Sequence, residues 1–148
     1  MNHYAFEDPL LVEALRRELA SWDDTPFFPR TACKGVGVDC IQFAIAVLQG
    51  VGIVGPVQWP RYSVKGGGPE LVEMIRARIA AETPLREVDL LPLMPGDVLL
   101  AAAPLHLAIV GAEGEIWQAL HPAGVQRGHL GEGQLSLISY IFRAHLRP

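Results

Sequence analysis

The sequence predicts an α+β fold, with helices in the first half of the chain and an antiparallel β-sheet in the second. Apolar residues recur at helical spacing over 9–22 and 69–81, whereas short apolar runs between turn residues follow Pro84. The 148 residues, half of them apolar, suffice for a single domain over 1–148 with a substantial core. The net charge is −4 without a basic run, so we expect no nucleic-acid surface. No apolar run approaches the roughly 20 residues of a membrane span.

The first two helices have different burial patterns. Asp8 should cap the first helix and Pro9 should occupy its first turn, where a missing N–H is tolerated. Apolar side chains then recur on one side of this helix: Leu11, Val12, Leu15, Leu19 and Trp22. An irregular loop over 21–34 follows. The second helix, from Asp39 to about Val51, is apolar on nearly all sides and should therefore be buried.

A glycine-rich loop over 55–68 separates these helices from a third. Its aromatic residues, Trp59 and Tyr62, allow two interpretations. In one the loop borders a binding cleft, and in the other it is a connector whose aromatic side chains pack on the core. Pro69 begins the third helix, which should run to about Ala81. Its inward residues should be Leu71, Met74, Ile75 and Ile79. Five strands are then predicted: 97–101, 105–110, 115–120, 125–129 and 135–144.

Cys40 is the strongest candidate nucleophile. A glycine-punctuated loop leads into Asp39, a favourable N-cap, which places Cys40 on the first turn of the buried helix. The free N–H groups and the helix dipole there favour a thiolate and can also bind an oxyanion. The alternative is an inert core cysteine. Cys33 is a loop residue or a redox partner of Cys40, and the two cysteines form neither a disulfide framework nor a metal motif.

His106 is the candidate base for that thiol. Residues alternate between the two faces of a strand, so His106 and Ala108 should share one face, and the larger apolar residues of 105–109 the other. Two interpretations follow: the imidazole points toward a helix packed on that face and can act as the base, or His106 is a structural histidine. Gln118 lies 12 residues further along, in an antiparallel strand across a tight turn, where its amide can accept a hydrogen bond from the imidazole.

Six short segments occur in an order and spacing that resemble one family, the NlpC/P60 cysteine peptidases, which are papain-like enzymes that cleave bacterial cell-wall peptides. The segments are Thr25-Pro26-Phe27, Gly37-Val38-Asp39-Cys40 with Phe43, Pro95-Gly96-Asp97-Val98, His106-Leu107-Ala108-Ile109, Ile116-Trp117-Gln118-Ala119 and Phe142-Arg143. The last of these, with Lys34 to Gly37, resembles the phage-associated branch.

The resemblance implies a papain-like NlpC/P60 fold and a Cys-His-polar triad that needs no cofactor. Cys40 would attack as a thiolate, His106 would act as general base, and Gln118 would hold the imidazole in the right tautomer. His121 is a rival for the third role, although Pro122 suggests that it lies in a turn. The resemblance also puts three side chains at substrate-binding positions: Phe27, Asp39 and Gln42.

The sequence departs from the family at three of these positions. Ile41-Gln42 replaces the usual Ser-Gly, Phe27 replaces a tyrosine and Gln118 replaces the commoner histidine. We therefore expect a thiol protease or related hydrolase that cuts an amide bond through an acyl-enzyme, and less firmly a peptidoglycan substrate. The alternatives are a papain-like acyltransferase or amidase, and a catalytically inactive structural module of a phage-tail-like assembly.

The N-terminal residues lack the basic start and apolar core of a signal peptide. We therefore expect a chain that is cytoplasmic as synthesised. Two alternatives fit this expectation: a phage particle carries the chain to the cell wall through its tail proteins, or the chain is a cytosolic recycling enzyme.

Overall fold

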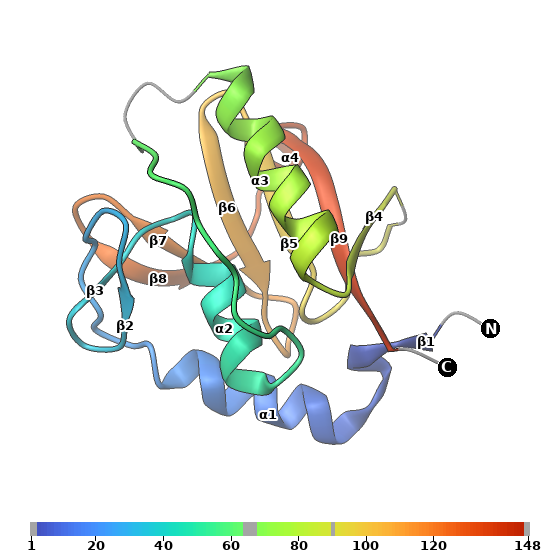
Figure 1. Ribbon diagram of the computed structural model, residues 1–148. Coiled ribbons are helices and arrows are strands. Elements are labelled where there is room, and N and C mark those ends of the chain that lie inside the picture. The colour runs from blue at the N-terminus through green and yellow to red at the C-terminus, as the bar shows by residue number, and fades with distance from the viewer. Residues whose placement is uncertain (1–2, 64–67, 90, 147–148) are drawn as a thin grey trace.

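The computed structural model describes residues 3–63, 68–89 and 91–146. Helices α1 (Pro9–Ala20), α2 (Phe43–Val51) and α3 (Pro69–Glu82) pack on an antiparallel sheet, as Figure 1 shows. Their inward side chains share one hydrophobic core with strand residues such as Leu107 and Phe142. The predicted α+β class with an antiparallel sheet is therefore confirmed. In the described part of the chain, no helix is both long enough and apolar enough to cross a bilayer.

The main sheet contains seven strands among the described residues, in the order β1-β9-β5-β6-β7-β8, with β4 also paired to β9. The strands are β1 (His3–Tyr4), β4 (Leu85–Val88), β5 (Val98–Ala102), β6 (Leu105–Val110), β7 (Ile116–Leu120), β8 (Gly124–Gly128) and β9 (Ile138–Leu146). A separate hairpin pairs β2 (Ala32–Cys33) with β3 (Gly37–Val38). Two short helical elements are the 3₁₀ helix η1 (Ala5–Glu7) and α4 (Glu132–Leu135).

The predicted strands differ from the structure mainly at short elements. The run expected as a strand over 135–144 begins instead at the end of α4, and β9 starts at Ile138. β1, β2 and β3 have only two residues each, which is too short to leave an alternating pattern in the sequence. β4 follows the helix-to-strand transition that the sequence indicated near Pro84.

α1 begins as the sequence predicts and positions the start of α2. The Asp8 Oδ1 atom accepts a hydrogen bond of 2.9 Å from the backbone N–H of Leu10. Leu15 and Leu19 are buried on the inward side. Just beyond the helix, the Trp22 ring meets Phe43 edge to face, with centroids 5.6 Å apart. This contact fixes the first residue of α2 against the end of α1.

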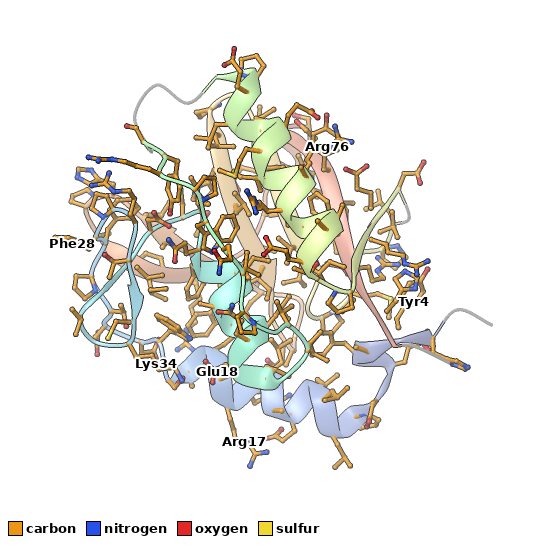
Figure 2. All side chains as sticks on the ribbon, in the orientation of Figure 1. Tyr4, Arg17, Glu18, Phe28, Lys34 and Arg76 are labelled. Atoms are coloured by element: carbon orange, nitrogen blue, oxygen red, sulfur yellow. The ribbon has the colours of Figure 1, made fainter. Side chains whose placement is uncertain are left out.

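Glu18 of α1 holds the β2-β3 hairpin in place. Its carboxylate pairs with the Lys34 ammonium at 3.0 Å and accepts a 2.9 Å hydrogen bond from the Trp22 indole N–H. Figure 2 shows Glu18 and Lys34 close together where the hairpin reaches α1. A Cβ atom at Gly50 of α2 would overlap the same carboxylate, so the glycine allows Glu18 to lie between the two helices. The hairpin that precedes Cys40 is thereby anchored.

The second helix starts later than predicted. α2 proper begins at Phe43, and residues 40–42 form a turn in which Phe43 N–H donates to the Asp39 carbonyl at 3.2 Å. The helix ends at Gly52, whose φ of +91° suits a glycine C-cap, whereas Gly50 lies inside the helix. Cys40 therefore lies on a turn before the helix and not on its first regular turn.

α3 confirms the predicted start at Pro69 and turns a slightly different face inward. Val72, Ile75 and Ile79 are buried, whereas Leu71 and Met74 are only partly buried. Val72 was not among the predicted inward residues.

Candidate active site

Asp39 organises the turn that carries Cys40. Its side chain is fully buried, and its Oδ1 atom accepts from the backbone N–H groups of Ile41 (3.1 Å) and Gln42 (2.8 Å). Its Oδ2 atom accepts from the Arg30 N–H (2.8 Å) and the Tyr62 hydroxyl (2.6 Å). Because all four contacts lie inside the protein, Asp39 is a structural residue here. Its predicted role in substrate binding is not supported by these contacts.

The surroundings of Cys40 raise the pKa of its thiol from an ordinary value of 9.0 to about 11. Burial is the main cause, since only 8% of the residue is exposed, and the adjacent Asp39 carboxylate adds to it. The sequence predicted the opposite shift from the helix dipole. The Asp39 carboxylate accepts from the N–H groups of Ile41 and Gln42, the capping contact predicted for Asp39, so these N–H groups are not free to stabilise a thiolate. The free protein therefore holds a neutral thiol at pH 7.

Tyr62 is a site residue that the sequence did not identify. Its hydroxyl donates to Asp39 and accepts a 3.0 Å hydrogen bond from the Gln42 Nε2 atom. Burial and the Asp39 carboxylate raise the pKa of Tyr62, and the nearby Cys40 raises it further. The segment that follows α2 thus places a phenol beside the thiol. Of the two interpretations of the 55–68 loop, packing on the core holds for Tyr62, while residues 64–67 lie outside the described residues.

Gln42 lies beside this phenol. Its side chain is half-buried and its amide is oriented by the Tyr62 hydroxyl. Phe27, the other predicted substrate-binding residue, is half-buried and its ring meets that of His121 edge to face at 5.3 Å. Cys33 is exposed on the β2-β3 hairpin, and both cysteines are free thiols.

His106 and Gln118 form the hydrogen bond that the sequence predicted. The imidazole Nε2 atom lies 2.7 Å from the Gln118 Oε1 atom, across neighbouring strands. An amide oxygen can only accept, so Nε2 carries the proton and Nδ1 keeps its lone pair. Burial lowers the pKa of His106, and the bond to Gln118 partly opposes this shift. At neutral pH the ring is therefore uncharged and oriented as a general base requires. His121 is exposed in a turn after β7, where the sequence placed it.

The structure corrects the predicted orientation of His106 relative to the helix. Leu107 and Ile109 are fully buried in the core that contains α2, whereas Ala108 belongs to a second cluster with Leu99 on the opposite face of the sheet. His106 shares the face of Ala108, so its imidazole points away from α2. The alternation was predicted correctly, but the large apolar face of β6 is the one that α2 covers, because burying it releases more free energy than burying an imidazole.

β6 and β7 separate near His106, and the gap between them, here called the opening, lies next to both Cys40 and His106. β6 and β7 pair only at Ile109–Trp117 and Val110–Ile116, so they separate before His106. The Val110 N–H donates to Asp97 on the β5 side, and the Leu107 N–H, three residues earlier, points the other way. This N–H interacts with the Cys40 sulfur and lowers the pKa of the thiol. The sulfur thus lies at the opening, one peptide group from the Cα atom of His106.

Cys40 approaches this opening from the α2 side, and the His106–Gln118 pair borders it on the other side. Among the described residues, no hydrogen bond joins the sulfur to the imidazole. The arrangement can deliver a proton from the thiol to Nδ1 only after the two groups approach each other.

A pocket of about 210 Å³ lies on the His106 side of the sheet. Its walls come from β5, β6, β7 and the segment that runs from Leu130 to Ile138. His106 and Gln118 form part of its lining. The sequence gave one signal for it, the small residues beside His106, but did not indicate a cavity.

Within the described residues, no three His, Cys, Asp or Glu side chains are grouped so that they could hold a metal ion. The groups that the structure places at the candidate site are a thiol, an imidazole and backbone N–H donors.

A comparison with models of known protein families and with curated proteins finds no match to this chain. The resemblance to the NlpC/P60 peptidases therefore stays a prediction that rests on the six short segments.

Proposed function

We propose that the chain is a thiol hydrolase with a papain-like NlpC/P60 fold, which cleaves an amide bond in a cell-wall-peptide-like substrate through an acyl-enzyme. The observation that carries this proposal is the 2.7 Å hydrogen bond between His106 Nε2 and Gln118 Oε1 at the opening that the Cys40 sulfur reaches. This bond leaves Nδ1 as the basic atom of the ring, at the opening that the potential nucleophile reaches from the other side. Such a nucleophile, base and orienting group are the three parts that covalent amide hydrolysis requires.

In the proposed reaction, the thiol proton moves to His106 Nδ1 as the sulfur attacks the amide carbonyl carbon. The backbone N–H of Cys40 lies beside its own sulfur and donates to the resulting oxyanion. His106 then gives the proton to the amide nitrogen, the C–N bond breaks, and a thioester remains on Cys40. Water, deprotonated by the same imidazole, hydrolyses the thioester and restores the thiol. If another nucleophile replaces water, the same groups perform acyl transfer.

The raised thiol pKa favours proton transfer during the attack over a thiolate that exists beforehand. A neutral thiol and a neutral imidazole are the stable forms of these two groups when both are buried. The imidazole therefore takes the proton while the sulfur attacks its electrophile.

The same observation favours a second candidate, the catalytically inactive structural module. A buried thiol with a pKa of about 11, covered by Tyr62, would be unreactive if the sulfur never reaches the imidazole.

Alkylation of Cys40 separates the two candidates. In a Cys33→Ala background, we would measure the rate of reaction with iodoacetamide from pH 5 to 11 by mass spectrometry. An active pair predicts a rate at pH 7 at least ten-fold above that of a thiol with a pKa of 11, and loss of this excess in His106→Ala. In the wild type the hydrogen bond to Gln118 raises the pKa of His106. Gln118→Leu removes this bond, so the pKa of His106 should fall and the acid limb of the profile should move to lower pH.

His121→Ala is the matched control and should leave the profile unchanged, since this residue is exposed and contacts Phe27. A profile that follows a pKa near 11 in every variant would reject the hydrolase and favour the structural module. If the alkylation profile instead supports the active pair, cell-wall peptide fragments would be tested for an acyl adduct on Cys40, and His106→Ala should abolish this adduct.

A further inference from the structure

The pocket on the His106 side of the sheet has an apolar lining. Seven of its lining residues are aliphatic side chains from β5, β6, β7, β9 and the segment before β9: Leu99, Ala101, Ala108, Ile116, Leu130, Leu137 and Ile138. Among the described lining residues, none is charged, and the polar ones are His106 and two glutamines. A charged ligand group would lose its hydration there without gaining a partner of opposite charge. The pocket therefore suits an uncharged apolar group.

The floor of the pocket is open because two of its residues are small. Ala101 and Ala108 lie on the neighbouring strands β5 and β6. Ala101 pairs directly with His106, and Ala108 is two residues from His106 on the same strand, so both alanines lie on the same face of the sheet as the imidazole. A cavity of about 150 Å³ lined by apolar side chains accommodates benzene. The 210 Å³ found here is larger, so it has room for roughly six to eight carbon atoms.

The apolar character continues to the mouth of the pocket. Leu137 lines it and is 54% exposed, although a large aliphatic side chain in water is unfavourable. Among the described lining residues, His106 and Gln118 are the two polar side chains that hydrogen-bond to each other. A ligand in the pocket would thus contact apolar side chains along most of its length and the imidazole at one end.

We propose that this pocket binds an uncharged apolar group of about six to eight carbon atoms, attached beside the carbonyl that Cys40 attacks. The inference rests on the proposed function, since His106 links the pocket to the thiol. A short fatty acyl chain and a leucine-like or phenylalanine-like side chain share this chemistry. The pocket thereby selects, among amide substrates, those with an apolar substituent over those with a charged one at this position.

Binding of simple amides tests the pocket without requiring turnover. The probes are octanamide for an acyl chain, N-acetyl-leucinamide for a side chain, and N-acetyl-glutamate as the charged comparator. Titrations of the full-length chain would follow the NMR signals of the Gln118 side-chain amide. We expect octanamide or N-acetyl-leucinamide to bind at least ten-fold more tightly than N-acetyl-glutamate, and the tighter of the two identifies the source of the apolar group.

Two variants locate the binding. Ala108→Leu fills the floor and should weaken binding at least ten-fold, whereas Ala20→Leu, the same change at an exposed position on α1, should leave it unchanged. Leu137→Asp puts a charge at the exposed mouth, where the fold tolerates it, and should also weaken binding. Equal binding by the wild type, Ala108→Leu and Leu137→Asp, or equal binding of N-acetyl-glutamate, would overturn the proposal.

Acylation of Cys40 by thioesters distinguishes this proposal from the proposed function. Octanoyl thioesters should acylate Cys40 at least ten-fold faster than acetyl thioesters, and Ala108→Leu should remove the difference. Equal rates for the two thioesters would overturn the apolar pocket and leave the hydrolase intact. Octanamide binding without any acylation would instead reject the hydrolase and, with it, the assignment of the pocket to the attacked carbonyl.

Discussion

The thiol of Cys40 is controlled by the residue before it. Asp39 uses both carboxylate oxygens to hold the turn, and in doing so it takes up the N–H groups that would otherwise stabilise a thiolate. Its negative charge raises the thiol pKa further. In the proposed hydrolase, such a thiol would gain reactivity only when His106 removes its proton.

This environment predicts that stability falls as the pH rises from about 9 to 11. The folded thiol has a pKa of about 11 and the unfolded thiol an ordinary value near 9.0, so the folded chain binds more protons in this window. The stabilising effect is complete below pH 9 and is lost as the pH passes the folded pKa. The free energy of unfolding, measured in urea, should decrease by about 2 kcal/mol more than in Cys40→Ala.

Tyr62 is present in both proteins, and because Cys40 also raises the pKa of Tyr62, the difference between the proteins reports the thiol together with its interaction with Tyr62. Equal pH dependence of the two proteins would mean that the Cys40 thiol has an ordinary pKa.

The turn before α2 depends on an element that is distant in sequence. The segment after α2 returns to it through the Tyr62 hydroxyl on Asp39 and the Arg30 guanidinium, whose Nη1 atom donates to the Tyr62 carbonyl at 3.5 Å. The segment just before β2 reaches the same carboxylate through the Arg30 N–H. Three segments therefore meet at one buried charge.

We expect Tyr62→Phe to lower the free energy of unfolding by about 2 kcal/mol, because a buried hydrogen bond to a charged acceptor is lost while the ring still packs. Chemical denaturation would measure this change. Tyr140→Phe is the matched control, since Tyr140 contacts Arg76 through its ring, 4.1 Å from the guanidinium carbon, and that contact survives. A loss as small as that of the control would show that the Tyr62 hydroxyl does not support the turn.

Across the whole molecule, a buried ion pair joins the entry of β5 to β9. Arg143 donates to Asp97 through Nε at 2.9 Å and Nη2 at 2.8 Å, and the side chains are 6% and 0% exposed. The Met94 N–H also donates to Asp97, so the Pro95-Gly96 turn is held by the same carboxylate. Two of the segments on which the family resemblance rests are therefore partners in space.

Removing one partner of this pair should destabilise the protein strongly. Arg143→Met leaves the Asp97 carboxylate buried without its counter-charge, which we expect to cost about 3–5 kcal/mol in urea denaturation. The double variant Asp97→Asn with Arg143→Met should be less destabilised than the sum of the single variants. Arg16→Met, which breaks an exposed pair with Glu113, is the control and should change stability little. Additive losses in the double variant would contradict coupling across the pair.

Several features could be predicted because their causes are local in the chain. The Asp8 cap, the start of α3 at Pro69 and the end of α2 at Gly52 follow from capping and backbone preferences of single residues. The His106–Gln118 bond followed from strand alternation and a tight turn, which fix the positions of residues 12 apart.

The sequence by itself determined the α+β class, the approximate positions of the longer helices and strands, and the pairing of His106 with Gln118, since periodicity and turn chemistry act over a few residues. Only the tertiary structure decided which face of β6 is covered by α2, that Tyr62 reaches Asp39, and that the thiol pKa rises. The pocket lined by Ala101 and Ala108 likewise depends on the packing of distant segments. These features arise from burial and long-range contacts, which no local pattern encodes.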